Sequence, residues 1–182
     1  MQATETLKHE HRVIELVLNA LERMANAAEA GQPVEREKAE RALEIVREFA
    51  DKCHHGKEEE RLFKVMQERG VPREGGPIGV MLQEHDAGRS HVRGMAEALP
   101  AAARGEAGAL RVFAEHARGY VGLLRQHIFK EDNILYPMAE QVLSADDDAQ
   151  LARSFEKFEE EEIGAGTHEK YHTWAHQLAE EQ

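Results

Sequence analysis

The chain has 182 residues, which is enough for one domain with a full hydrophobic core and short for two. Hydrophobic residues make up 41% and charged residues 32%, a balance that argues against disorder and favours a soluble helical domain. The net charge of −12 argues against a nucleic-acid partner, because phosphate binding needs a basic surface. The single cysteine, Cys53, cannot form an internal disulfide, and no apolar run suits a signal peptide or a membrane span. We therefore expect a cytoplasmic protein without a membrane partner.

Apolar residues that recur in steps of three and four predict the first two helices. The first should begin at Thr4 or Thr6, either of which is a possible N-cap, and end at Gly31. The second should begin near Pro33 and end at Gly70. The expected inner face of the first helix is Leu7, His11, Ile14, Leu18, Leu21, Ala25 and Ala28. That of the second is Leu43, Val46, Ala50, His54, Glu58, Leu62 and Val65.

Two further long helices follow a glycine-rich connection at residues 71–77. The third helix should be ended by Pro100, and the fourth should begin near Glu106 and be kinked or ended locally by Pro137. The expected inner face of the third helix is Ile78, Met81, His85, Gly88, Val92, Met95 and Leu99. That of the fourth is Leu110, Phe113, Ala117, Tyr120, Leu124, His127, Glu131, Ile134 and Met138.

The remaining residues predict a helical tail. A start signal at Ser144 precedes a helix over about 146–162, and Thr167 caps a short final helix that reaches about Glu181.

Four long helices with short connections predict an all-α fold, an up-down-up-down four-helix bundle with an additional C-terminal helical segment. We assign residues 1–143 to the bundle and residues 144–182 to a C-terminal extension that packs along it.

The two halves of the bundle resemble two copies of one helical hairpin. The pattern H-x-x-K-E-[ED]-x-x-L-[FY] begins at His54 in the second helix and again at His127 in the fourth. The first and third helices each carry a Glu-His pair that ends at His11 and at His85. Each half therefore offers one histidine and then a His-x-x-x-Glu pair.

This spacing suits metal ions. Residues four apart lie on one helix face, so His54 with Glu58 and His127 with Glu131 can converge on one site. Two carboxylates facing each other in a core are costly unless cations lie between them. Four imidazoles and two bridging carboxylates can serve two ions and leave positions for a small ligand. Nitrogen and oxygen ligands without thiolates favour iron or manganese over a closed zinc site.

These residues are the ones that resemble the hemerythrin/HHE cation-binding family, in which the first and third helices supply a histidine and the second and fourth supply H-x-x-x-E. The resemblance covers about Leu7 to Val142. It implies a non-haem centre of two iron ions with an oxo or hydroxo bridge, and small partners such as O₂, NO or peroxide. The ligands that it implies are His11, His54, Glu58, His85, His127 and Glu131.

One position departs from the family pattern. Oxygen-carrying hemerythrins have a second histidine four residues after the third-helix ligand, and here that position is Arg89. His55, beside His54, is either a further ligand, as in some family members, or an exposed or supporting histidine. The departure favours redox or sensing roles over simple oxygen carriage.

Three functions fit the resemblance. The centre binds O₂ or NO for sensing, or it is an enzyme that consumes peroxide or another reactive species, or iron loading stabilises a module that a partner protein reads.

Other motifs are weaker. The stretch His168–His172 matches the zincin signature H-E-x-x-H, but no strand or downstream ligand accompanies it, so we expect an accidental match. A ferritin-like E-x-x-H occurs once, at Glu169–His172, whereas that class needs two.

For several residues outside the main motif, a structural role is the simplest interpretation. Tyr120 is either a core residue or a hydrogen-bond donor to an oxygen species in the site. Cys53 is expected to pack rather than to sense redox state, and the acidic run 156–162 to be a solvated helix face. The histidines expected to face solvent are His9, His91 and His116.

Overall fold

The computed structural model describes residues 1–180, and every regular element in that range is helical. The first long helix is α1 (Gln2–Glu29), and the third is α4 (Pro77–Ala102). The second and fourth combine α-helical segments with wider π-helical segments, which are labelled η. The second comprises α2 (Arg36–Ile45), η1 (Val46–His55), η2 (Glu58–Leu62) and α3 (Phe63–Glu68). The fourth comprises α5 (Ala107–Lys130), η3 (Glu131–Leu135) and α6 (Tyr136–Val142).

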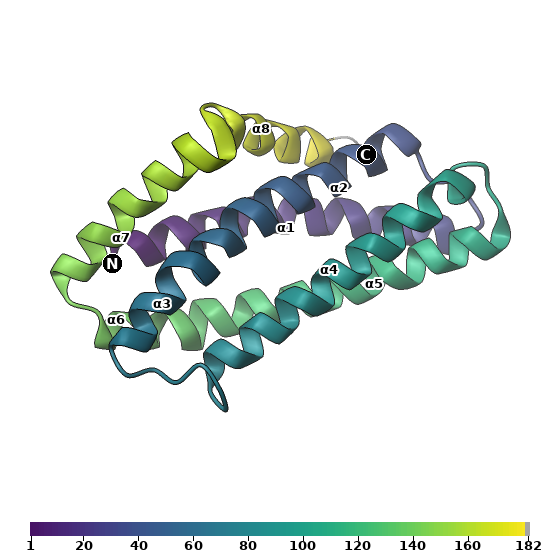
Figure 1. Ribbon diagram of the computed structural model, residues 1–182. Helices are drawn as coiled ribbons and strands as arrows, with labels where there is room; N and C mark the ends of the chain where they lie inside the picture. The colour runs from purple at the N-terminus through teal and green to yellow at the C-terminus, as the bar shows by residue number, and fades with distance from the viewer. Residues whose placement is uncertain (181–182) are drawn as a thin grey trace.

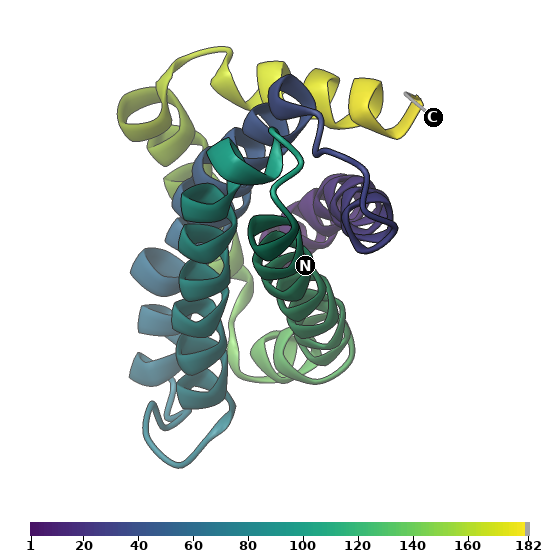
Figure 2. The same ribbon diagram turned by 90° about the vertical axis from the view of Figure 1, so that its right-hand side faces the viewer.

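Successive long helices run antiparallel, as Figure 1 shows, and the view in Figure 2 shows them grouped around one axis. The α1 helix packs against α5 and the second helix, and α4 packs against α5 and the second helix. The expected all-α, up-down-up-down four-helix bundle is confirmed. No helix in residues 1–180 combines the length and the apolar character that crossing a bilayer requires.

The C-terminal segment consists of α7 (Ala145–Phe158), η4 (Glu159–Gly164) and α8 (Thr167–Glu180). These helices lie along α1 and the second helix (Figures 1 and 2). The final helix was expected to reach Glu181, which lies outside the described residues. A domain boundary after residue 143 stays a prediction.

The contact between α7 and the start of α1 explains where α1 begins. The Asp148 carboxylate accepts hydrogen bonds from the backbone N–H groups of Gln2 and Ala3, each at 2.9 Å. These N–H groups have no partner inside their own helix, and a carboxylate also suits the positive helix end. Thr4 and Thr6 therefore lie within α1 rather than capping it, and the prediction of a threonine cap is wrong.

The π-helical turns change the inward-facing register of the second and fourth helices. Ile134, expected in the core, is 52% exposed, whereas Leu135 is buried. In the second helix, the same shift of one residue buries Met66 in the core instead of Val65, the residue expected there. A π turn closes its hydrogen bonds at i→i+5, so it adds one residue before the apolar face returns inward.

Two prolines interrupt their helices less than expected. Pro100 lies inside α4, which continues to Ala102, so the prediction that Pro100 ends the helix is wrong. A proline this late removes one intrahelical hydrogen bond, and the next N–H groups still find acceptors, such as Ala103 N–H to Leu99 O at 2.8 Å. Pro137 lies in the first turn of α6, directly after η3, where a missing N–H is tolerated.

The apolar core is divided into two clusters along the bundle. One cluster includes Leu7, Leu62 and Leu135, and the other includes Ile14 and Phe49. His11 lies between Leu7 and Ile14 in sequence, at the junction of the two clusters. The fold therefore places a layer of polar side chains between two dry regions.

Candidate metal centre

Seven ionisable side chains meet in this polar layer, and each is at most 4% exposed. All four long helices contribute, because the side chains occupy inward positions in the helical repeat. The structure brings together every ligand that the sequence predicted, namely His11, His54, His55, Glu58, His85, His127 and Glu131.

The first group of potential ligands joins α1, η1 and η3. His11 Nε2 lies 3.0 Å from His54 Nε2 and 3.1 Å from Glu131 Oε2. One ligand atom from each of the three residues lies within 4.8 Å of the others. We call His11, His54 and Glu131 the two-histidine group.

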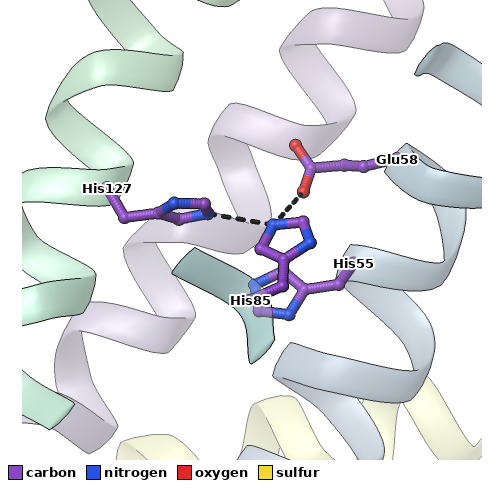
Figure 3. A group of neighbouring side chains, drawn as sticks. All are labelled: His55, Glu58, His85 and His127. Atoms are coloured by element: carbon purple, nitrogen blue, oxygen red, sulfur yellow. Dashed lines mark hydrogen bonds and ion pairs between the residues drawn. The ribbon is translucent and has the colours of Figure 1, made fainter. Parts of the chain in front are cut away.

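The second group joins the second helix, α4 and α5, and Figure 3 shows His85 between His127 and Glu58. His85 Nε2 lies 3.1 Å from His127 Nε2 and 3.4 Å from Glu58 Oε2. The ring of His55 stacks on that of His85 with centroids 3.8 Å apart. We call His55, Glu58, His85 and His127 the three-histidine group.

The two glutamates connect these groups. Glu131 places one carboxylate oxygen 3.1 Å from His11 Nε2 and the other 3.1 Å from His127 Nε2. Glu58 Oε2 lies 3.4 Å from His85 Nε2 and 3.8 Å from His54 Nε2. Each carboxylate therefore faces imidazole nitrogens of both groups and could serve a cation held by either group.

Four buried polar atoms in the layer have no hydrogen-bond partner within residues 1–180: His55 Nε2, Glu58 Oε2 and both carboxylate oxygens of Glu131. Leaving a buried polar atom without a partner costs about 1–3 kcal/mol, and more for a charged group. Such atoms gathered at one place fit cations, which would bind the lone pairs that no N–H or O–H group reaches. The residues present therefore suit metal ions.

The other ring nitrogen of every histidine in the layer is held by a carboxylate. A carboxylate only accepts, so each Nδ1–H donates, which fixes the ring orientation and leaves Nε2 directed inward. This arrangement is typical of metal-binding histidines. The pairs are His11 with Asp132 at 2.7 Å, His54 with Glu10 at 2.9 Å, His55 with Asp51 at 3.2 Å, His85 with Glu59 at 2.7 Å and His127 with Glu84 at 2.9 Å.

These supporting carboxylates were not identified from the sequence, although the duplicated motifs contain all of them except Asp51. The glutamate of each Glu-His pair, Glu10 or Glu84, holds the histidine of a neighbouring helix rather than the one beside it. The motif lysines complete the pattern, because Lys57 contacts Glu10 and Lys130 contacts Glu84. The repeated Glu-His and Lys-Glu spacings were therefore signals for this network.

A tyrosine that the sequence did not single out enters the layer. Tyr136 donates a hydrogen bond from its hydroxyl to Glu58 Oε1 at 2.7 Å, and its ring stacks on His11. The equivalent residue in the first half is Phe63, which has no hydroxyl, so this contact breaks the internal symmetry. Burial and the nearby Glu131 carboxylate raise the pKa of Tyr136 well above its usual value, so the hydroxyl stays protonated.

Without metal, the layer holds its charge as imidazolium–carboxylate pairs. Burial opposes protonation of His11, but its contacts with Asp132 and Glu131 raise the pKa to about 9. Burial likewise opposes protonation of His127, but the Glu131 carboxylate raises its pKa to about 10. The burial of His55 and the charge of His85 lower the pKa of His55, which favours its neutral form.

Arg89, which stands where oxygen carriers have a histidine, contacts the supporting carboxylates instead of the centre. Its guanidinium lies 2.8 Å from both Asp51 Oδ1 and Glu59 Oε1. These carboxylates hold His55 and His85, so Arg89 neutralises them from the outer side. The fifth histidine of the layer comes from the second helix, as His55.

The weaker motif H-E-x-x-H does not form a site. Its first histidine, His168, contacts Glu10, while the ring of His172 packs against that of His176. Cys53 is buried and outside the ligand groups, and burial raises the pKa of its thiol to about 12. Of the acidic run, Glu159 is partly buried against Lys57.

The prediction that three histidines face solvent is correct for His9 and wrong for the other two. His91 and His116 are half-buried between α4 and α5, with their Nδ1 atoms 3.2 Å apart. Gly94 and Gly119 make this possible, because a Cβ atom on either glycine would collide with the ring from the opposite helix.

The fold and the layer define a helical bundle with a buried histidine–glutamate site suited to metal cations. The Hemerythrin HHE cation binding domain family matches residues 2–139, and the chain belongs to this family.

The chain is also similar to curated mycobacterial proteins described as uncharacterized. These are Rv1995 of Mycobacterium tuberculosis strain H37Rv, MT2051 of strain CDC 1551 and Mb2018 of Mycobacterium bovis. Each is 25% identical over 166 residues, which cover 89% of this chain and 63% of the relative. No solved structure matches the chain.

Proposed function

We propose that this chain holds a non-haem di-iron centre and binds O₂ or a related small molecule, such as NO or peroxide, for sensing or handling that species. The observation that carries the proposal is the position of Glu58 and Glu131. Each faces histidines of both ligand groups and keeps unpartnered oxygens in a fully buried layer.

The two ligand groups are unequal, which supports a role in binding a small molecule. One ion would be held by His11 and His54, the other would be held by three histidines, and both glutamates would serve both ions. The two-histidine group offers fewer protein ligands, so its ion keeps more room for an added molecule. Bound iron would supply electrons to that molecule and a position to hold it.

The surrounding residues supply apolar packing and a hydrogen-bond donor. Apolar clusters on both sides of the layer exclude bulk water. The Tyr136 hydroxyl, which donates to Glu58 Oε1, lies 3.4 Å from His11 Nε2, so it could turn this hydrogen bond toward a molecule beside the two-histidine group. The supporting carboxylates keep the imidazoles in place while a small molecule enters or leaves.

Anaerobic reduction of the iron-loaded protein followed by exposure to O₂ or NO tests the proposal. We expect a stable optical change that reverses when the gas is removed, and that is lost in His54→Ala. Slow irreversible oxidation with no reversible phase would contradict gas binding.

A peroxide-consuming activity is the second candidate, and the position of the Tyr136 hydroxyl 3.4 Å from His11 Nε2 favours it, because this hydroxyl could hydrogen-bond to a peroxide oxygen. The assay is oxygen evolution from added peroxide. We expect turnover to be lost in His54→Ala and reduced in Tyr136→Phe. No turnover by a fully metallated sample would rule this activity out.

A further inference from the structure

A pocket of about 230 Å³ opens between η1 and α4, beside the three-histidine group. His55 and His85 form its inner end, and Tyr120 of α5 also lines it. The pocket is several times larger than a diatomic ligand needs, since one water molecule occupies about 30 Å³ of liquid. It is also below the range of about 300–1,000 Å³ that is typical of drug-sized ligands.

Two arginine side chains without an ion-pair partner among the described residues line this pocket, although the net charge of the chain is −12. Arg47 and Arg93 line it, are exposed, and have no ion-pair or hydrogen-bond partner within residues 1–180. The third arginine, Arg89, is already bound to Asp51, the one acidic residue of the lining. The remaining charge of the pocket is therefore that of two free guanidinium groups.

A hydrogen-bond donor without a partner in the described chain also lines this pocket. Tyr120 is only 2% exposed as a residue, but its hydroxyl oxygen is not fully buried and has no hydrogen-bond partner in the described chain, so it faces the pocket. Burial raises the pKa of Tyr120 far above its usual value, so the hydroxyl remains a donor. The hydroxyl is therefore available to donate a hydrogen bond to a ligand atom in this pocket.

The rest of the lining is apolar. Val46 of η1 and Val92 of α4 line it, and Gly88 adds no side chain beside the Tyr120 ring. A carboxylate suits the two guanidinium groups, since guanidinium binds carboxylate through paired hydrogen bonds. An apolar body suits the valines and the aromatic ring.

We propose that this pocket binds a small organic carboxylate with an apolar body, held by Arg47, Arg93 and Tyr120 against the outer face of His55. The three residues that would hold the carboxylate are not metal ligands, although His55 and His85 form the inner end of the pocket, so the proposal goes beyond the di-iron function. Its occupant would lie next to the three-histidine group and alter access to it.

Titration calorimetry of the full-length protein, with its metal content measured, tests the proposal with benzoate as probe and benzamide as the neutral analogue. We expect benzoate to bind at one site and benzamide to bind at least tenfold more weakly. Arg47→Gln and Arg93→Gln should each weaken benzoate binding at least tenfold, and Tyr120→Phe should weaken it several-fold.

Arg153→Gln is the matched control, because Arg153 is an exposed, unpaired arginine on α7, away from the pocket. We expect it to bind benzoate like the unmodified chain. Equal binding of benzamide, or equal weakening in Arg153→Gln, would overturn the proposal. Benzoate held only by the metal would bind unchanged in Arg47→Gln and Arg93→Gln, and that result would overturn it too.

Discussion

Individual residues of the polar layer show how ionisable side chains persist in a core. Each histidine has a carboxylate on its outer nitrogen, and each motif lysine neutralises the carboxylate behind a histidine. Only the inward atoms, such as the oxygens of Glu131, are left without hydrogen bonds. The chain has therefore satisfied every outer contact and left the lone pairs that cations require.

Removing one supporting carboxylate should loosen a ligand without removing it. In Glu84→Gln, the His127 imidazole loses its charged partner, and we expect metal affinity to fall about 10–100-fold. Competition with a chelator of known affinity measures the change. Glu97→Gln, an exposed position on the same helix, should keep the affinity of the unmodified chain, and an equal loss there would contradict a specific role for Glu84.

The raised pKa values of His11 and His127 predict the pH dependence of the metal-free protein. The unfolded pKa is 6.5 and the folded values are about 9 and about 10, so folding binds protons between these limits. This stabilisation is complete below pH 6.5 and is lost as the pH rises through the folded values. We expect the thermal midpoint of metal-free protein to be higher at pH 6.5 than at pH 10.

The His11→Gln, His127→Gln double variant is the control for this pH dependence, because glutamine does not titrate. Its thermal midpoint should change less over the same range. An equal fall of the thermal midpoint in the double variant would mean that other titrating groups cause the pH dependence.

Among the elements, the π turns decide the register of the second and fourth helices. The helix count, the antiparallel order and the set of side chains that meet in the polar layer could be predicted, because they follow from apolar periodicity and from the duplicated motif. The inward positions of Leu135 and Met66 could not, since periodicity assumes an α-helix throughout. Tyr136 was missed for the same reason, because it follows η3 and lies off the expected face.

A buried lysine of the second long helix joins the C-terminal segment to the polar layer. Lys57 is fully buried and contacts Glu10 on α1 and Glu159 on η4, which ties the extension to the carboxylate behind His54. The sequence suggested only a solvated acidic face here. Lys57 pairs with glutamates that are 47 and 102 residues away in the sequence. Pairs this far apart leave no periodic pattern from which they could be predicted.

Lys57→Met should leave the buried Glu10 carboxylate with only the imidazoles of His54 and His168 as partners. We expect a loss of about 3 kcal/mol in the free energy of unfolding, measured by urea denaturation. Lys64→Met removes an exposed lysine that pairs with Glu60 one turn away, and should cost at most about 0.5 kcal/mol. Similar losses in both variants would contradict a special role for the buried lysine.

For the whole molecule, metal binding and folding should be coupled, because the layer is assembled from all four helices. With free metal at about 100 times its dissociation constant, we expect the thermal midpoint to rise by about 5–10 °C over that of the stripped protein. Calorimetry with and without a chelator measures this shift. An unchanged midpoint would mean that bound metal does not stabilise the fold, and it would exclude an iron-responsive folding role.

The most direct test of the metal centre is the iron content of the folded protein, measured together with its optical spectrum. We expect two iron ions per chain and an oxo-to-iron charge-transfer band. In a Glu58→Ala, Glu131→Ala variant that still folds, both should be lost. A folded, unmodified protein that takes up no metal ion under any loading condition would contradict the central claim that cations lie among these buried histidines and glutamates.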